Sequence, residues 1–528
     1  MFLLAAIVSA AIRVDQVGYP SNAPKIAIVA ARQSPHFTIV RADGSIACEG
    51  RLSPPMFDRD SGDRVQLADF SSLTAPGTYT LRVAGESTNV TIGDDPYRSL
   101  LRLTTRAFTG QRCGTAVDLG GGYSHPACHL QSAFHRSSGH TGPAHVTGGW
   151  HDAGDYGRYV VNSGISTGTL LWANELFSAD ILDEIRWNLE WMLAMQDDDG
   201  GAWHKETSES FPPFVQPQDD HSLQYVIGRS SCATADLAAV AAIASRVYRS
   251  VDEPFARRSL GAAQRAWSWL KDHPNITFRN PPGVKTGEYD DRDCSDERLW
   301  AAAELWRSSG DAGAHAYFRQ HWREALRMNG PPDWSHVGAL AAWTYVLSNR
   351  GDAGIANAIR DRSLAGADEI VQRSRQHAYR IPMRTRDYMW GSNAVAANYG
   401  LELLVANAMK PDRSYIDTTF EIIHYLLGRN PFSLSWVTGA GTNSVQRPHH
   451  RPSASDQVDA PWPGLLAGGP NRNRQDPALR KLPRGVPPAR MYVDDQESYA
   501  SNEVAINWNA PLVFILAGTS EVARRGEP

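Results

Sequence analysis

Two aspartates stand three residues apart, at positions 152 and 155, in the segment GGWHDAGDYGRY. Neighbouring carboxylates repel each other, so at least one of them needs hydrogen-bond donors or a cation to stay ionised. An ionised carboxylate that holds a water molecule can act as a general base. The alternative is that one aspartate only caps the helix predicted at 159–177. The pair is therefore a candidate for base chemistry.

A glutamate near the C-terminus supplies the complementary group. Glu503 lies in the segment YVDDQESYASNEVAINWNAPLVF, directly before an apolar run with helical spacing. A carboxyl group held against apolar and aromatic side chains has a raised pKa and can donate a proton at neutral pH. One acid and one base on opposite faces of a bond are what glycoside hydrolysis requires.

A proline-braced loop, RPHHRPSASD at 447–456, carries directional hydrogen-bond donors. The guanidinium of Arg451 could form a fork to two sugar hydroxyls, and His449 could donate beside it. The alternative is a structural loop with a solvated arginine. The chain also has 16 Trp and 18 Tyr, whose rings suit the flat faces of sugars. Trp390, Trp436 and Trp203 are the candidate platforms, and each could instead belong to the core.

Cysteines and histidines gather between positions 113 and 146. Zinc in a structural site takes four sulfur or nitrogen ligands in a tetrahedron. Cys113, Cys128, His129 and one later histidine would supply them. We expect His145 as the fourth ligand, with His140 and then His135 as alternatives. Four protein ligands leave no open position, so we expect this zinc to be structural; buried free thiols are the alternative.

An acidic loop, EYDDRDCSDERLW at 288–300, precedes another predicted helix. Carboxylate-rich loops of this kind bind Ca²⁺. Asp293, Asp296 and Glu297 are the candidate ligands, and Asp291 is a weaker one. The alternative is a solvated acidic loop in which Asp296 lies near a helix N-terminus.

The elements that must position these residues fall into two parts. Residues 12–95 contain short β-rich runs separated by Gly, Pro, Asn and Asp, which predicts a small β-sandwich. Residues 96–528 contain repeated apolar positions at i, i+3 and i+4, which predicts helices. Long loops at 197–230, 275–295 and 429–500 interrupt the helices, and loops of that length are usually functional.

Composition excludes several classes of protein. The net charge is −5 and no long basic run is present, so nucleic acid is not an expected partner. The first 11 residues, MFLLAAIVSAA, are too short to span a bilayer. They are similar to a signal peptide without its positively charged start, so we expect a secreted or periplasmic protein, not a membrane protein. Five cysteines, an odd and sparse set, argue against a disulfide framework. We expect a monomer.

Several motifs in order resemble glycoside hydrolase family 9: GGWHDAGDYGRYVV, PHHRPS, PWPGLLAGGPN and SYASNEVAINWNAPL. QVGYP at 16–20 and RCG at 112–114 are similar to the branch with an N-terminal immunoglobulin-like domain. The resemblance implies a mainly α fold, with an immunoglobulin-like β-sandwich followed by an (α/α)6 barrel. It implies structural zinc at an adjacent Cys–His pair, and calcium at the Asp–Glu pair of the acidic loop.

The resemblance also implies the chemistry. The enzyme would hydrolyse β-1,4-glucans with inversion, using Asp155 as the general base and Glu503 as the general acid. Asp152 would help to hold the water of Asp155. The substrate-gripping residues would be His449, Arg451 and Tyr499, with Trp390 as a candidate platform.

Three other activities stay open at this point. The first is an exo-acting glucosidase or glucosaminidase, for which Asp494, Asp495 or Glu497 could bind a substrate ammonium. The second is a non-catalytic sugar-binding protein, against which the retention of all three acids argues. The third is a zinc hydrolase acting on amides, which would need an open zinc position.

Overall fold

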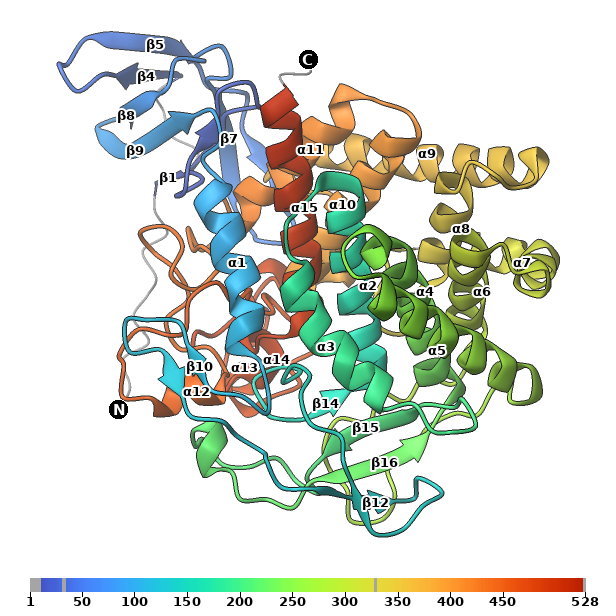
Figure 1. Cartoon of the computed structure of the whole chain (residues 1–528). Helices are drawn as coiled ribbons and strands as arrows, with labels where there is room; N and C mark the ends of the chain where they lie inside the picture. The colour runs from blue at the N-terminus through green and yellow to red at the C-terminus, as the bar shows by residue number, and fades with distance from the viewer. Residues whose placement is uncertain (1–10, 31–34, 327–329, 526–528) are drawn as a thin grey trace.

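The computed structural model describes residues 11–30, 35–326 and 330–525. Its first part is a β-sandwich at one end of the molecule (Figure 1). One sheet has the order β1 (Ile12–Arg13), β3 (Ile26–Ala30), β7 (Arg64–Asp69) and β6 (Met56–Phe57). The other has the order β2 (Tyr19–Pro20), β9 (Glu86–Gly93), β8 (Gly77–Val83), β4 (His36–Val40) and β5 (Ile46–Arg51).

Alternation of apolar and polar residues builds this sandwich. In β8 the side chains of Tyr79, Leu81 and Val83 are buried, while those between them are not. Successive side chains of a strand point to opposite faces, so one face of β8 joins the core between the sheets. Phe37 and Ile39 reach the same core from β4.

In the described part of the chain, twelve helices of ten or more residues form two concentric rings beside the sandwich. The inner ring closes on itself, because each member packs against the next: α2 (Val160–Phe177), α4 (Ser231–Val247), α6 (Ser295–Ser309), α8 (Gly338–Leu347), α10 (Ser392–Met409) and α15 (Ile506–Arg525). The outer ring consists of α1 (Arg98–Gly110), α3 (Leu182–Ala194), α5 (Glu253–Asp272), α7 (Ala312–Ala325), α9 (Ala353–Gln376) and α11 (Arg413–Leu426). The predicted (α/α)6 barrel after an immunoglobulin-like sandwich is confirmed.

Residue size decides which helices lie inside. Nearly every residue of α4 is buried, and most of them are alanine or another small side chain. Small residues let inner helices approach closely: a Cβ on Gly168 of α2 would lie 2.7 Å from the ring of Trp300 on α6. Outer helices such as α5 are amphipathic and expose charged residues on one face.

The sandwich is fastened to the barrel by a buried polar contact. Asp15, beside β1, accepts a hydrogen bond from the hydroxyl of Tyr97 at 2.8 Å. The same carboxylate lies 2.9 Å from Nδ1 of His424 on α11. All three side chains are buried, so the two parts share an interior at this point.

The segment 197–230, expected as a loop, contributes two strands to a further sheet. Its order is β13 (Pro143–Ala144), β12 (Ala133–Arg136), β16 (Tyr225–Arg229), β15 (Trp203–Thr207) and β14 (Arg158–Tyr159). This sheet lies under the helices, at the end of the barrel away from the sandwich (Figure 1). Other short elements include β10 (Val117–Asp118), β11 (Ser124–His125), α12 (Arg451–Ser455), α13 (Pro477–Arg480) and α14 (Tyr499–Asn502).

One disulfide joins the first turn of α4 to the residue before α6, between Cys232 and Cys294. One disulfide among five cysteines does not make a disulfide framework, as the small and odd number of cysteines predicted. Cys48, Cys113 and Cys128 are free thiols.

Candidate active site

A cleft of about 1010 Å³ opens over the N-terminal ends of the inner helices. Its walls come from the segments that lead into α2, α6, α8, α10 and α15, so residues distant in sequence meet there. They include Asp152, Asp155, Tyr289, Trp334, Met389, Trp390, His449, Arg451, Tyr499 and Glu503. The three predicted catalytic acids line this one cleft, together with His449, Arg451, Tyr499 and Trp390.

Each of the two carboxylate oxygens of Asp152 accepts a hydrogen bond from a side chain. Asn162 of α2 donates to its Oδ1 at 2.5 Å, and the hydroxyl of Tyr289 donates to its Oδ2 at 2.6 Å. Burial and the charge of Asp155 raise the pKa of Asp152 to about 7, although both hydrogen bonds oppose that rise. Its orientation is therefore fixed even though its ionisation is costly.

Asp155 lies next to positive charge. It is 6% exposed, and its Oδ2 accepts a hydrogen bond from the backbone N–H of Gly157 at 3.0 Å. Burial raises the pKa of Asp155, whereas Arg451 and Lys205 act in the opposite direction. Of the two aspartates, Asp155 is the one whose anionic form these cations favour.

Glu503 faces the opposite electrostatic conditions. It lies between α14 and α15, in a parallel bridge with His449. Burial raises the pKa of Glu503 well above its ordinary value, and the charges of Asp155 and Asp152 raise it further. These surroundings favour the protonated form of the carboxyl group, the form that a proton donor needs.

His449 and Arg451 are fixed by backbone carbonyls. The Nδ1 atom of His449 lies 2.5 Å from the carbonyl oxygen of Gln496, and burial lowers the pKa of this histidine to about 4. Arg451 donates from Nε to the carbonyl of Pro212 at 2.9 Å and from Nη1 to that of Gly154 at 2.8 Å. Two of its donors are therefore used within the protein, and its charge bears on Asp155 and Glu503.

Gly154 is required by this packing. A Cβ at that position would lie 1.9 Å from the carbonyl oxygen of His449. No side chain fits in that space, so a residue other than glycine would push the histidine loop away from the two aspartates.

Two of the predicted platforms lie elsewhere. Trp390 and Tyr499 do face the cleft, with ring centroids 5.6 Å apart. Trp436 is fully buried, however, and Trp203 is 9% exposed, so both are core residues. Tyr289 and Trp334 were not predicted, but they also line the cleft, with ring centroids 5.0 Å apart. Tyr289 lies in the acidic loop and Trp334 in a separate segment, and neither is part of a motif that could have identified it.

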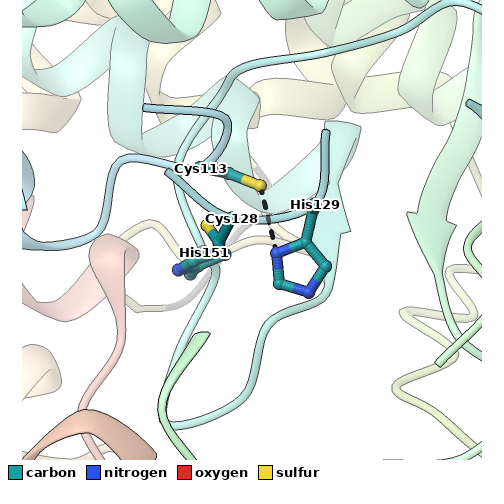
Figure 2. Close-up of side chains that lie close together, drawn as sticks. All are labelled: Cys113, Cys128, His129 and His151. Atoms are coloured by element: carbon teal, nitrogen blue, oxygen red, sulfur yellow. Dashed lines mark hydrogen bonds between the residues drawn. The ribbon is translucent and has the colours of Figure 1, made fainter. Parts of the chain in front are cut away.

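A second cluster lies just outside the aspartate loop. Cys113, Cys128, His129 and His151 each place one sulfur or nitrogen atom within 4.8 Å of the others. Figure 2 shows Cys113 Sγ facing the ring of His129, with Cys128 and His151 beside them. The Sγ–Nδ1 distance from Cys113 to His129 is 3.6 Å, and Cys128 Sγ lies 3.9 Å from Nε2 of His151.

These distances fit zinc. Bond lengths of about 2.3 Å to sulfur and 2.1 Å to nitrogen put the two ligand types about 3.6 Å apart in a tetrahedron. The Nε2 atom of His129 lies 3.3 Å from Oδ2 of Asp220, the kind of carboxylate contact that orients a metal-bound imidazole. The set contains two sulfurs and two nitrogens, and the residues present therefore suit a closed structural site.

Comparison with known proteins agrees with this geometry. The family model for glycosyl hydrolase family 9 matches residues 97–516, and that for a cellulase N-terminal ig-like domain matches residues 8–88. The chain belongs to glycosyl hydrolase family 9. It is therefore a glycoside hydrolase.

Relatives of this family 9 chain are similar along almost its whole length. Endoglucanase D of Acetivibrio thermocellus is 36% identical over 96% of this chain and 83% of its own length. The cellodextrinase of Butyrivibrio fibrisolvens is 33% identical over 96% of this chain and 99% of its own. The crystal structure of a Zn-binding triple mutant of GH family 9 endoglucanase J30 has a TM-score of 0.92 and 37% identity, covering 95% of this chain and 99% of that one.

The fourth member of the cysteine–histidine cluster in this family 9 chain corrects the sequence analysis. His145, the expected ligand, is exposed, and its Nδ1 lies 3.2 Å from the hydroxyl of Ser132. His151 takes its place because Arg112 and Trp150 pair as an antiparallel bridge, which brings together the segments that carry Cys113 and His151. The alternatives His140 and His135 lie together against Trp203.

A third cluster concerns the predicted calcium ligands. Asp296 and Glu297 are buried at the start of α6, and Asp236 of α4 is buried near them. Within the described part of the chain, neither carboxylate oxygen of Asp236 or of Glu297 has a hydrogen-bond partner. Burial raises the pKa of both groups, and the neighbouring carboxylates Asp296 and Asp291 raise it further.

Asp293 lies outside this cluster. It is exposed, and its Oδ1 accepts a hydrogen bond from the backbone N–H of Ser295. Asp236, which comes from a helix 60 residues earlier in the sequence, is the buried carboxylate that sequence reasoning missed. The described residues contain no group of three carboxylates whose oxygens all lie within 4.8 Å of one another. The residues thus fit a cation only if backbone oxygens complete its shell.

Proposed function

We propose that the protein is an inverting hydrolase of β-1,4-glucosidic bonds in cellulose-type or mixed-linkage glucans and their oligosaccharides. The observation that carries the proposal is the pairing in one cleft of Asp155, whose anionic form nearby cations favour, with Glu503, whose proton is retained. The relatives named as an endoglucanase and a cellodextrinase support the substrate class.

Asp155 is the general base in this proposal. It removes a proton from a water molecule, which attacks the anomeric carbon while Glu503 protonates the departing sugar oxygen. Asp152, clamped by Asn162 and Tyr289, accepts a second hydrogen bond from the same water and orients it. An inverting site needs room for this water, so its two carboxyl groups stand roughly 6.5–9.5 Å apart.

The other cleft residues grip the sugar next to the scissile bond. His449 has its Nδ1 occupied by a backbone carbonyl, which leaves Nε2 for a sugar hydroxyl. Trp390 and Tyr499 offer their rings to a sugar face. Arg451 contributes its positive charge more than a fork of donors, because two of its N–H groups already bind carbonyl oxygens.

The test compares three substrates with the purified protein. Hydrolysis of carboxymethylcellulose and cello-oligosaccharides, with no release from chito-oligosaccharides, is the expected result. Preferential cleavage of chito-oligosaccharides would favour the glucosaminidase instead. The structure offers that alternative little support: Asp494 accepts hydrogen bonds from the backbone N–H groups of Gln446 and Arg447, and none of Asp494, Asp495 and Glu497 lines the cleft.

Zinc is proposed as a structural cofactor held by Cys113, Cys128, His129 and His151. When bound, it would join the loop at 113 to the segment directly before Asp152. Metal analysis of protein purified without chelators should find one zinc per chain. The Cys128→Ser variant should lose the metal and melt at a lower temperature. His145→Ala is the matched control and should keep both the zinc and the wild-type melting temperature. Loss of zinc in this control alone would show that His145 is the fourth ligand.

Calcium is a second proposal, for the carboxylates of Asp236, Asp291, Asp296 and Glu297. A divalent cation would give the unpartnered oxygens of Asp236 and Glu297 their missing counter-charge. Added Ca²⁺ should raise the melting temperature after treatment with a chelator. The shift should disappear in Glu297→Gln and persist in Asp293→Asn. An unchanged shift in Glu297→Gln would contradict the site.

We also propose the domain division at residues 95 and 96, between the last strand of the sandwich and α1. Export is proposed as well, by the signal-like start of the chain, of which residues 1–10 lie outside the described residues. None of the described helices is both long enough and apolar enough to cross a membrane.

A further inference from the structure

Lys205 is a lysine with no exposed surface, in the middle of β15. Its Nζ atom donates hydrogen bonds to Oδ1 of Asn280 at 2.7 Å, Oγ1 of Thr286 at 3.0 Å and the carbonyl oxygen of Gly287 at 2.7 Å. An ammonium group has three N–H donors, so all of them are used on one loop. Lys205 belongs to none of the family motifs and to none of the predicted sites.

The loop that Lys205 holds is closed by its own contacts as well. Asn280 donates from its side chain to the carbonyl of Thr286 at 2.8 Å. The neighbour of Lys205 on the strand, His204, places its Nε2 atom 3.0 Å from the carbonyl oxygen of Glu288. Two consecutive residues of β15 therefore anchor the loop at consecutive carbonyls, those of Gly287 and Glu288.

The anchored loop ends at a strained residue. Tyr289 has a φ of 47°, in the left-handed region that residues with a side chain rarely adopt. Such a backbone persists only where the surroundings impose it. The strain aims the hydroxyl of Tyr289 at Asp152, to which it donates at 2.6 Å.

We propose that Lys205 is a positioning residue for the hydrolytic reaction, which fixes Tyr289 against Asp152 by holding the carbonyl of Gly287 and the side chain of Thr286. The inference rests on the proposed roles of Asp152 and Asp155. Lys205 does not line the cleft, so it acts on the water of the base only through the loop and through its charge.

The charge of Lys205 has a second effect on the same pair. The groups that face its ammonium are the carboxylates of Asp155 and Glu288 and the rings of Tyr159 and Phe278, whose centroids lie 5.5 and 5.6 Å away. Burial lowers the pKa of Lys205 to about 7, and the two carboxylates oppose this. In return, the cation lowers the pKa of Asp155, together with Arg451. Asp152 and Glu503 are the other titratable carboxyl groups of the site.

The decisive variant is Lys205→Met, which keeps most of the length of the unbranched side chain and removes its donors and charge. We expect kcat on cello-oligosaccharides to fall between about 10-fold and 100-fold with KM changed less than about threefold, because the reacting groups are displaced rather than the sugar contacts. The acidic limb of the kcat/KM profile should move to higher pH, because Asp155 loses a cation.

Lys25→Met is the matched control. Lys25 is also fully buried, and its Nζ donates to the carbonyls of Ser21, Ala23 and Pro20 in the β-sandwich. It should destabilise the protein without moving kcat or the pH profile. If Lys205→Met does not fold, Thr286→Val carries the test, since it removes one acceptor at nearly constant volume.

A double-mutant cycle with Tyr289→Phe separates positioning from general destabilisation. If Lys205 acts through Tyr289, the double variant should lose little more kcat than the more damaging single variant. Losses that multiply independently, or a wild-type kcat and acidic limb in Lys205→Met or in its substitute Thr286→Val, would overturn the inference. A wild-type protein without activity on any β-1,4-glucan would instead overturn the proposed function.

Discussion

Two regions of the molecule contain carboxyl groups whose pKa is raised by burial: the cleft, and the cluster formed by Asp236 of α4 with Asp296 and Glu297 of α6. They differ in what surrounds those acids. In the cleft, Asp152 has two directed donors, Asp155 has a backbone N–H and neighbouring cations, and all face an open space of about 1010 Å³. Within the described residues, the oxygens of Asp236 and Glu297 have no donor at all, and neither residue lines that cleft.

The comparison shows that a raised pKa alone does not indicate catalysis. A catalytic carboxyl group also needs access to substrate and neighbours that set its protonation state and direction. The carboxyl groups of Asp236 and Glu297 do not line the cleft, so a substrate there cannot reach them. Their pKa values are raised because they are buried next to other carboxyl groups. Substitutions in the two regions should therefore fail in different ways.

The largest expected effect is that of Glu503→Gln. The departing oxygen loses its proton donor, so kcat on cello-oligosaccharides should fall by about 10²–10⁴-fold while substrate binding persists. An aryl glycoside with a good leaving group needs less protonation and should be hydrolysed at a partly restored rate. Near-full activity on cello-oligosaccharides would remove Glu503 from the role of acid, and the contrast between the two regions would fail.

Asp236→Asn should produce the opposite pattern. It removes one titratable carboxyl group from the sealed cluster, so we expect a change of about 1–3 kcal/mol in the free energy of unfolding and a weaker response to Ca²⁺. The kcat of the folded variant should stay within about twofold of the wild-type value. Chemical denaturation with and without Ca²⁺, together with kcat, measures both. A loss of kcat as large as that of Glu503→Gln would show that the two regions are coupled.

The last expected effect, visible only in how stability varies with pH, is that of Asp152→Asn. The pKa of Asp152 is higher in the folded protein, about 7, than in the unfolded chain. The folded state therefore holds an additional proton between about pH 4 and 7, and this contribution to stability is present below pH 4 and lost as the pH rises through 7. Asparagine does not titrate, so the variant should gain relative to the wild type over this range, by at most about 4 kcal/mol. Melting temperatures of both proteins from pH 4.5 to 7.5 measure the gain; parallel curves would contradict the shift.

Local patterns predicted the fold and the members of the cleft well. The alternation in 12–95, the helical periodicity after 96, and motifs around Asp155, His449 and Glu503 all lie in continuous stretches of sequence. What remained hidden depends on contacts between distant segments. His151 replaces His145 because residue 150 pairs with residue 112, and no spacing rule reveals such a pairing. Asp236 and Lys205 reach their clusters from other elements, and Tyr289 is marked by a backbone conformation that the sequence does not show.

The stereochemistry of the product tests the central claim most directly. If Asp155 activates a water on the face of the sugar opposite Glu503, the bond to the anomeric carbon must form with inversion. Proton NMR of a fresh digest of a β-1,4-linked cello-oligosaccharide should then show the α-anomer first, before mutarotation. An initial β-anomer signal would mean that a carboxylate attacks the sugar directly, and it would contradict the roles proposed for Asp155 and Glu503.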